Sequence, residues 1–286
     1  MLAANVFFDP LVNVLEKALL ALHTVIPSYG WALIALAAIV RLAMWPLSNI
    51  QFRSMAEMQK VQPLVKQIQA KFKGDPQAQN AAMMALYKEH KVNPMAGCLP
   101  MLLPMPILIG LFWAIQNMIT VKGPNAFADE HWLWIGSAVS KAYPQIFASS
   151  LGHPDIFLLG LYTISMYFTV RYGSPPSSDP QQAQTQKMRA FISPAMIAFF
   201  GFKYQWASAL YIYWLATNVF TVGQQYLMFR KYGLIGPKRA ATLAAAAAEP
   251  LPLSASKASK QLNGTNGAPE SNGKRSYKPP KKRARR

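Results

Sequence analysis

The residue of this chain that most clearly could do chemistry is Arg41, because it stands inside an apolar stretch, Tyr29 to Leu47. That stretch is close to the roughly 20 residues that cross a bilayer. A guanidinium at such a depth costs about 2.5–3.5 kcal/mol on insertion scales, and it usually faces protein or a wet cavity. An unpaired cation there needs water, polar neighbours or a visiting anion. Arg41 could therefore attract an anionic group by its charge.

A second group of polar side chains lies on the predicted helix of residues 206–229. Its polar and aromatic residues are spaced by three and four positions and so share one helical face; they are Tyr211, Trp214, Asn218, Thr221 and Gln225. No Asp or Glu lies in any apolar segment to neutralise Arg41. We therefore predict a hydrated groove, open to the cytoplasm, formed by Arg41, Trp214, Asn218, Thr221, Gln225, Thr163 and Ser165.

Two simpler interpretations of the same residues stay open. Arg41 is about six residues, or roughly 9 Å, from the end of its segment. Its side chain could therefore extend to the cytoplasmic headgroups instead of facing a groove. The polar face of residues 206–229 could likewise make ordinary hydrogen bonds between helices.

Other kinds of chemistry find no support in the sequence. The four histidines lie in separate segments without metal-ligand spacing, and there is no phosphate-binding loop or Ser/His/Asp arrangement. Cys98 is the only cysteine, so an intrachain disulfide is impossible. We expect a protein that is not an enzyme and holds no cofactor and no metal.

The elements that must position these residues are helices in a membrane. The chain has 286 residues, of which 52% are hydrophobic and 14% charged, with several long apolar runs. This composition predicts an all-α, multi-pass membrane protein. The predicted spans are residues 29–47, 98–121, 156–172, 188–203 and 206–229.

The segments outside the spans have distinct characters. Residues 1–28 contain an amphipathic stretch, Pro10 to His23, that is too short and polar to span, so we expect an interfacial helix outside the cytoplasm. A buried helix of a soluble part is the alternative. An external loop (122–155) and a cytoplasmic linker (173–187) complete the connections. The N-terminus lacks the basic region of a signal peptide, and transit-peptide composition is not visible, which favours a bacterial plasma membrane.

Residues 48–97 are polar and helical in pattern, and they predict a hairpin projecting into the cytoplasm. Its first arm has a coiled-coil-like seam, its arms meet at a turn from Lys73 to Pro76, and Pro63 should kink or interrupt the first arm. The seam residues are Met58, Val61, Val65 and Ile68. The hairpin carries seven Lys and Arg, whereas the loop before residue 156 carries two. This asymmetry places the N-terminus outside and the C-terminus in the cytoplasm.

The C-terminal tail, residues 230–286, is the most basic part of the chain. It carries 14 Lys and Arg and two Glu, which amounts to two-thirds of the chain's net charge of +18. Its low apolar content predicts disorder, and its charge predicts a polyanionic partner, either ribosomal RNA or anionic lipid. The contact residues expected at its end are Lys281, Lys282, Arg283, Arg285 and Arg286.

Several motifs resemble those of the YidC/Oxa/Alb family of membrane protein insertases, in its short five-span form. They span residues 8–232 and comprise Arg41-Leu42, Trp45-Pro46-Leu47, Leu86-Tyr87-Lys88, the run from Asn93 to Pro100, the run from Leu210 to Trp214, Thr217-Asn218 and Gln224-Gln225. Two positions depart from the family pattern: Pro104 stands where the family often has Gln, and Trp206 to Ala209 replaces a frequent Pro-Ala-Gly.

The resemblance implies an insertase for nascent membrane proteins. In it, Arg41 would meet hydrophilic or acidic parts of a nascent chain, and the third and fifth spans would guide its apolar helix into the lipid bilayer. The hairpin would recruit substrates and the tail would touch the ribosome, with the protein acting alone or beside the Sec translocon and without nucleotide hydrolysis. Two alternatives stay open: a small-solute transporter or channel with Arg41 as an anion site, and a membrane-anchored scaffold in which Arg41 is dispensable.

Overall fold

The computed structural model describes residues 5–93, 104–120, 127, 130–173 and 180–248. Within these ranges the secondary structure is helical, apart from one isolated bridge between Trp132 and Ile135. This confirms the predicted all-helical fold. The helices are α1 (Asn5–Val25), α2 (Tyr29–Ala43), α3 (Trp45–Lys71), α4 (Pro76–Glu89), α6 (Pro104–Thr120), α7 (Ala138–Ala142), α8 (Ile156–Tyr172), α9 (Pro180–Tyr204), α10 (Ser208–Lys231) and α11 (Pro237–Ala248).

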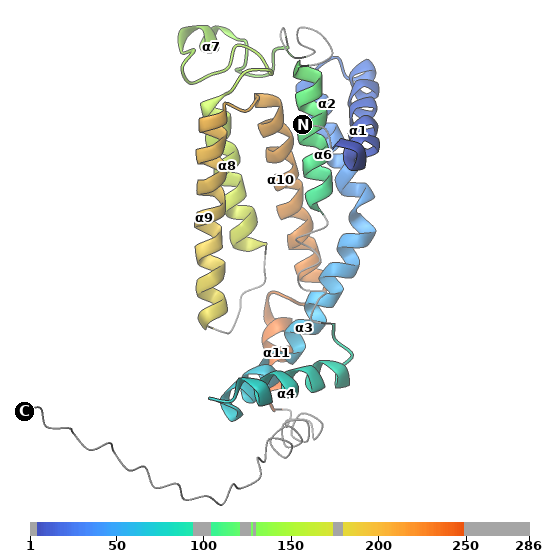
Figure 1. Cartoon of the computed structure of the whole chain (residues 1–286), viewed down its shortest axis with the longest axis vertical. Coiled ribbons are helices and arrows are strands. Elements are labelled where there is room, and N and C mark those ends of the chain that lie inside the picture. Colours follow the sequence, from blue (N-terminus) through green and yellow to red (C-terminus); the bar gives the residue numbers. More distant parts are fainter. Residues whose placement is uncertain (1–4, 94–103, 121–126, 128–129, 174–179, 249–286) are drawn as a thin grey trace, which may run out of the picture.

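The helices form a long bundle with a smaller group of helices at one end (Figure 1). In the bundle, α10 packs between α2 and α8, α9 covers α8, and α1 packs on both α6 and α2. The core of the bundle includes the fully buried side chains of Leu33, Leu36, Leu111, Tyr211 and Tyr213. At the lower end in Figure 1, α3 continues from α2 and meets α4 and α11, while the short helix α7 lies at the opposite end.

By length and composition, one bent pair among the described helices is long and apolar enough to cross a membrane, namely α2 and α3, which meet at 56°. No single described helix meets both criteria, although Met105–Ile119 of α6 and all of α8 are apolar at shorter length. The five spans stay predictions.

Helix α1 is longer than the amphipathic stretch from Pro10 to His23 and contributes to the core of the bundle. Val12, Leu15 and Leu19 are buried. The Glu16 side chain is also buried, and its Oε1 accepts a 3.0 Å hydrogen bond from Nδ2 of Asn117 on α6. A buried carboxylate needs such a donor, because desolvation without one is costly. The interfacial location of this helix stays a prediction.

The predicted hairpin is formed by α3 and α4, with residues 94–97 outside the described part. Its turn is built as expected: Gly74 has a φ of 97°, and the Asp75 side chain caps α4 by accepting a 3.0 Å hydrogen bond from the backbone N–H of Ala78. Pro63 was expected to kink or interrupt the first arm, but α3 runs through it from Trp45 to Lys71, so it does not interrupt the helix and the kink stays a prediction. The turns on either side of this proline are held by packing against α4.

The packed face of the hairpin differs slightly from the predicted seam. Val61 and Ile68 are buried as expected and Val65 packs at the edge, but Met58 is half-exposed outside this cluster. Leu64 is buried in its place, together with Ala82 and Leu86 of α4. The pattern 61, 64, 68 is an equally regular helical face, so the register of the contact is set by α4.

Part of the predicted disordered tail of residues 230–286 is helical in the structure. Helix α10 extends to Lys231, and α11 follows at Pro237–Ala248 and packs on α3. Alanine is the strongest helix former, and a run of alanines fills most of α11. The predicted contact residues Lys281, Lys282, Arg283, Arg285 and Arg286 lie outside the described residues.

Candidate functional site

A cavity of about 180 Å³ lies where α2 passes into α3, with α10 forming the facing wall. Apolar residues of α6 and the end of α8 close its other sides. The residues that line it are Val40, Arg41, Met44, Ser48, Gln51, Phe52, Met55, Ile107, Leu108, Gly173, Tyr213, Thr217, Thr221, Gln224 and Gln225.

The bend between α2 and α3 creates this site, and it has a local cause. Pro46 has no backbone N–H to continue the hydrogen-bond ladder of α2, so the helix ends at Ala43 and restarts at Trp45. Met44 belongs to both ends: its N–H bonds to the carbonyl of Val40 and its own carbonyl accepts from the N–H of Ser48. The break therefore places Arg41, in the last turn of α2, beside the first turns of α3.

Arg41 is half-buried in the cavity wall, near Tyr213. No Asp or Glu in the described part of the chain forms an ion pair with it. A cation in a partly desolvated place without a counter-ion is stabilised only by water, neutral polar groups or an anion that enters. The charge of Arg41 therefore remains available to a visiting group.

Four other polar residues of the cavity carry buried atoms that make no hydrogen bond to any residue that the structure describes. The atoms are Nε2 of Gln51, Oγ1 of Thr217, Nε2 of Gln224 and Oε1 of Gln225. Leaving one buried donor or acceptor unsatisfied costs about 1–3 kcal/mol. Their concentration around one cavity indicates that its contents are polar.

The structure brings together only some of the predicted groove residues. Arg41, Thr221 and Gln225 line the cavity, whereas Trp214, Asn218, Thr163 and Ser165 do not. Trp214, Asn218 and Ser165 lie at the contact between α8 and α10. Nδ2 of Asn218 donates a 2.9 Å hydrogen bond to Oγ of Ser165, and the hydroxyl of Thr163 bonds to the carbonyl of Leu159 in its own helix.

Trp214 is held among other aromatic rings. Its ring centroid is 5.3 Å from that of Tyr162 and 5.6 Å from that of Trp206. For Trp214, Asn218 and Ser165, the alternative interpretation, contact between helices, describes the structure better than lining of a groove. The physical reason is that α10 is polar on two adjacent faces, one toward α8 and one toward the cavity.

Tyr213, Thr217 and Gln224 also line the cavity from α10, although they were not among the predicted groove residues. A signal for them was present, because Tyr213, Thr217, Thr221 and Gln224 are spaced by four, four and three residues and share a helical face. Ser48 and Gln51 of α3 were also missed. Both belong to the segment predicted to project as a hairpin, but its first turns form part of the cavity wall.

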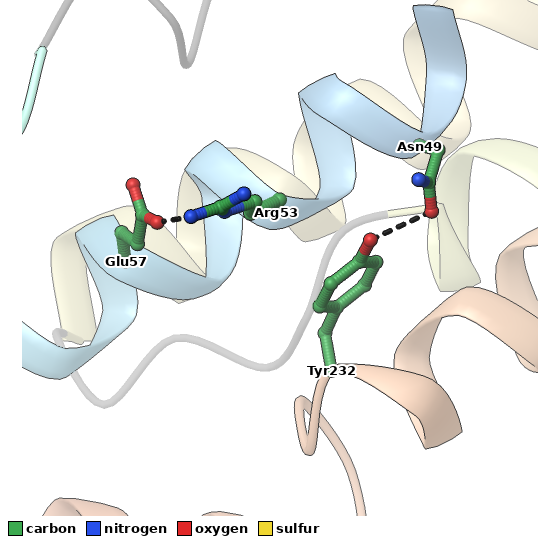
Figure 2. Close-up of polar contacts among 4 residues, drawn as sticks. All are labelled: Asn49, Arg53, Glu57 and Tyr232. Carbon is green, nitrogen blue, oxygen red and sulfur yellow. Dashed lines mark hydrogen bonds and ion pairs between the residues drawn. The ribbon is translucent and has the colours of Figure 1, made fainter. Parts of the chain in front are cut away.

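Side-chain contacts join the α3 wall of the cavity to the C-terminal end of α10. Oδ1 of Asn49 accepts a 2.6 Å hydrogen bond from the hydroxyl of Tyr232 (Figure 2). It also accepts a 3.2 Å bond from Nζ of Lys231. The rings of Phe52 and Phe229 pack edge to face at 5.6 Å. Since Phe52 also lines the cavity, these contacts connect the cavity wall to the segment that leads into α11.

Figure 2 shows a second polar contact on α3, the ion pair between Arg53 and Glu57. Nε of Arg53 is 3.2 Å from Oε1 of Glu57, and the two side chains are 73% and 42% exposed. Exposed pairs four residues apart contribute only about 0.3–0.5 kcal/mol. Neither Arg53 nor Glu57 lines the cavity, so substitutions of this pair can serve as controls for substitutions in the cavity.

A helical bundle with a cation-bearing polar cavity at a broken apolar helix suggests a membrane protein. Comparison with known families agrees with this class. The model of the 60Kd inner membrane protein family matches residues 21–234, a range that includes every residue of the cavity. The chain therefore belongs to the 60Kd inner membrane protein family.

Individual relatives carry more specific names than the family. The chain is 34% identical over 221 residues to a protein of Neisseria gonorrhoeae (strain NCCP11945), and it is 33% identical over 221 residues to one of Janthinobacterium sp. (strain Marseille). Both are named "Membrane protein insertase YidC". The matches cover 77% and 76% of this chain but only 35% and 36% of the relatives. The chain thus spans about a third of the length of the curated relatives it matches.

A solved structure shows a likeness in fold. A chain described as "Active YidC insertase crystal structure with the first transmembrane domain resolved" matches with a TM-score of 0.50 and 24% sequence identity. The match covers 78% of this chain and 46% of that one. The names of these relatives give no support to the alternative of an anion transporter or channel.

Proposed function

We propose that this chain is a membrane protein insertase that passes polar parts of nascent membrane proteins through the cavity at Arg41. One observation carries the proposal. Arg41 has no acidic partner in the described part of the chain, and it shares its cavity with buried polar atoms that make no hydrogen bond there. The names of the relatives support the same function.

The mechanism needs no covalent step and no nucleotide. A hydrated cavity within the membrane shortens the distance that a polar segment must cross without water. The fixed charge of Arg41 attracts acidic residues of that segment, and the attraction is stronger there than in bulk water. Partition of the substrate's own apolar helix into lipid drives the process, with the membrane potential acting on its charges.

The proposal extends to location and partners. We place the chain in a bacterial plasma membrane, with its N-terminus outside and the end bearing α3, α4 and α11 in the cytoplasm. The lysines and arginines of α3 and α4 support this orientation by the positive-inside rule. Nascent chains and the lipid bilayer are the primary partners. Cooperation with the Sec translocon, and binding of ribosomal RNA or anionic lipid by the basic tail, belong to the same proposal.

An insertion assay tests the central claim. Purified protein in liposomes receives a single-span substrate with an acidic N-terminal tail, and protection of the tail from added protease scores its translocation. We expect Arg41→Ala to lose most activity and Arg41→Lys to retain it, because the charge is the essential property. Arg53→Ala is the matched control, since it removes an exposed arginine of α3 outside the cavity.

Two outcomes would contradict the proposal. Full activity of Arg41→Ala would exclude the intramembrane charge as the essential feature for this substrate. Absence of activity in the folded wild-type protein would reject insertion by this chain alone. A chain that ends at Ala248 separates the role of the tail, because it keeps α11 intact. We expect it to lose salt-sensitive cosedimentation with ribosomes while it retains insertion in liposomes.

A further inference from the structure

The segment from residue 130 to residue 155 lies at the α7 end of the bundle (Figure 1). It is folded around the carboxylate of Asp155. We call this segment the end cap. The side chain of Asp155 is buried and accepts three hydrogen bonds, from Nε1 of Trp134 at 3.1 Å and from the backbone N–H groups of Ala148 and Leu158 at 2.9 and 2.7 Å. The last of these bonds caps α8. The end cap therefore has a defined shape that is attached to the bundle.

The end cap turns its tryptophans inward and exposes several other apolar residues. Trp132 is 8% exposed, and Trp134 is tied to Asp155. In contrast, Val139, Tyr143 and Ile146 are 47%, 54% and 40% exposed. Backbone hydrogen bonds from Tyr143 to Val139 and from Ile146 to Tyr143, each of 3.0 Å, place these three residues on consecutive turns. They form one exposed apolar strip, which a loop surrounded by water would not favour.

This strip continues into α8 without a polar break. The N–H of Ile156 bonds to the carbonyl of Ile146 at 2.9 Å, and the rings of Phe147 and Phe157 are 5.6 Å apart. Ile156 and Phe157 are themselves exposed, as are Ile164 and Phe168 further along α8. In a chain of an inner membrane protein family, the natural environment of this exposed apolar face of α8 is lipid.

The charges of the end cap fit the same environment. Between Glu130 and Asp155 the only charged side chain apart from histidines is Lys141. Since successive helical residues are about 100° apart, Lys141 lies on the flank of α7 opposite Val139, with the buried Ser140 between them. A lysine beside an apolar strip can extend to headgroups while the strip enters the acyl region.

We propose that the end cap is a lipid anchor, which inserts Val139, Tyr143 and Ile146 into the headgroup and acyl boundary of the bilayer at the N-terminal end of α8. The anchor also holds α10, because the N–H groups of Ser208 and Ala209 bond to the carbonyls of His153 and Leu151 at 2.9 and 3.1 Å. It thereby sets the depth of both helices in the membrane. The inference does not depend on the proposed insertase function.

Fluorescence quenching in liposomes tests this anchor. In full-length protein with Cys98→Ser, single cysteines replace Val139, Tyr143 or Lys141 and are labelled with an environment-sensitive dye. The liposomes contain phosphatidylcholine and phosphatidylglycerol, with a nitroxide on the lipid chain or with iodide in the water. We expect at least twofold stronger nitroxide quenching and twofold weaker iodide quenching at 139 and 143 than at 141, which is the matched control in the same helix.

Three results would overturn the proposal. Equal access of iodide to all three positions would place the strip in water. Protection of 139 and 143 only in native membranes, and not in liposomes, would indicate a protein partner instead of lipid. The third measurement needs no substitution: hydroxyl-radical oxidation of Tyr143 in the wild-type protein in liposomes should be several-fold slower than that of a free tyrosine, and an equal rate would reject the anchor.

Discussion

The side-chain amide of Asn218 donates a 2.9 Å hydrogen bond to the hydroxyl of Ser165, and this bond joins α10 to α8 in the middle of the bundle. The Ser165 hydroxyl donates in turn to the backbone carbonyl of Tyr162 at 2.7 Å. Asn218 is therefore satisfied by a neighbouring helix and not by the contents of the cavity. Its expected role is structural, in contrast to that of Thr217, the preceding residue.

This relationship predicts coupled stability effects. Asn218→Ala and Ser165→Ala should each destabilise the protein, and a double-mutant cycle should give a coupling of about 0.6 kcal/mol, with an upper bound near 1.7, as for other hydrogen bonds between membrane helices. Reversible unfolding in mixed micelles measures the cycle. Additive effects of the two substitutions would show that the bond does not exist in solution. Insertion activity should fall no more than the folded fraction does.

Substitution of Thr217 by valine distinguishes a wet cavity from a dry one. Oγ1 of Thr217 is buried at the cavity beside Tyr213, and no hydrogen bond of ordinary geometry joins it to a described residue. If the cavity is hydrated, as the proposed function requires, Thr217→Val should change stability by less than about 1 kcal/mol, because the lost bond is to water. Insertion of a substrate with a polar tail should nevertheless decrease, since the passage becomes less polar.

The measurement is thermal unfolding and insertion on the same preparation. In a dry cavity the valine would instead relieve an unsatisfied hydroxyl, and stability would rise by about 1–3 kcal/mol. A marked rise in stability with unchanged insertion would thus argue against the hydrated path. Thr163→Val is the matched control, because the hydroxyl of Thr163 bonds to its own helix and does not line the cavity.

The contact between Asn49 and Tyr232 should control how firmly α11 is held on α3. Tyr232→Phe removes the 2.6 Å bond to Oδ1 of Asn49 but keeps the ring in its place (Figure 2). A neutral hydrogen bond contributes about 0.5–1.5 kcal/mol net, so amides of residues 237–248 should exchange with solvent roughly three- to tenfold faster. Hydrogen exchange with mass spectrometry on the full chain measures this local opening.

Glu57→Gln serves as the control for that experiment. It breaks an exposed ion pair on the same helix, which contributes about 0.3–0.5 kcal/mol, and it leaves Asn49 untouched. Faster exchange of α11 in Glu57→Gln but not in Tyr232→Phe would show that the Asn49 contact does not hold α11 in place.

Much of this architecture follows from periodicity along the chain. The apolar helical stretch before Arg41 and the turn at Asp75 are local patterns, and both appear in the structure where they were expected. Local sequence does not determine which helix or cavity a polar helical face will contact. The three-and-four spacing on α10 fits two adjacent faces equally well, and only the position of Ser165 on α8 decides that Asn218 faces α8 while Thr217 lines the cavity.

Two other features depended on tertiary contacts that no local pattern reports. Trp132 and Trp134 have the composition of an interfacial belt, but packing and the buried Asp155 turn them inward. The alanine run of α11 lacks apolar periodicity and indicated disorder, yet its propensity and its packing on α3 produce a helix. In both cases the structure depends on a contact with residues that are distant in sequence, namely Asp155 for Trp134 and helix α3 for α11.

The packing of α8, α9 and α10 can be tested with two glycines that differ only in their surroundings. A Cβ added to Gly201 of α9 would be 2.7 Å from the hydroxyl of Tyr211 and 3.0 Å from Cδ1 of Leu159, whereas a Cβ added to Gly160 of α8 would meet nothing within 4 Å. Alanine is favoured over glycine in a helix by about 1 kcal/mol. Gly160→Ala should therefore stabilise the protein by up to that amount.

Gly201→Ala gains the same helical preference but must displace Tyr211, which is fully buried. Overpacking in a well-packed core costs about 1–3 kcal/mol, so the net effect should be a loss of stability, with a melting temperature several degrees below that of Gly160→Ala in the same detergent. Equal melting temperatures for the two variants would mean that α9 does not pack closely on α10 at this point.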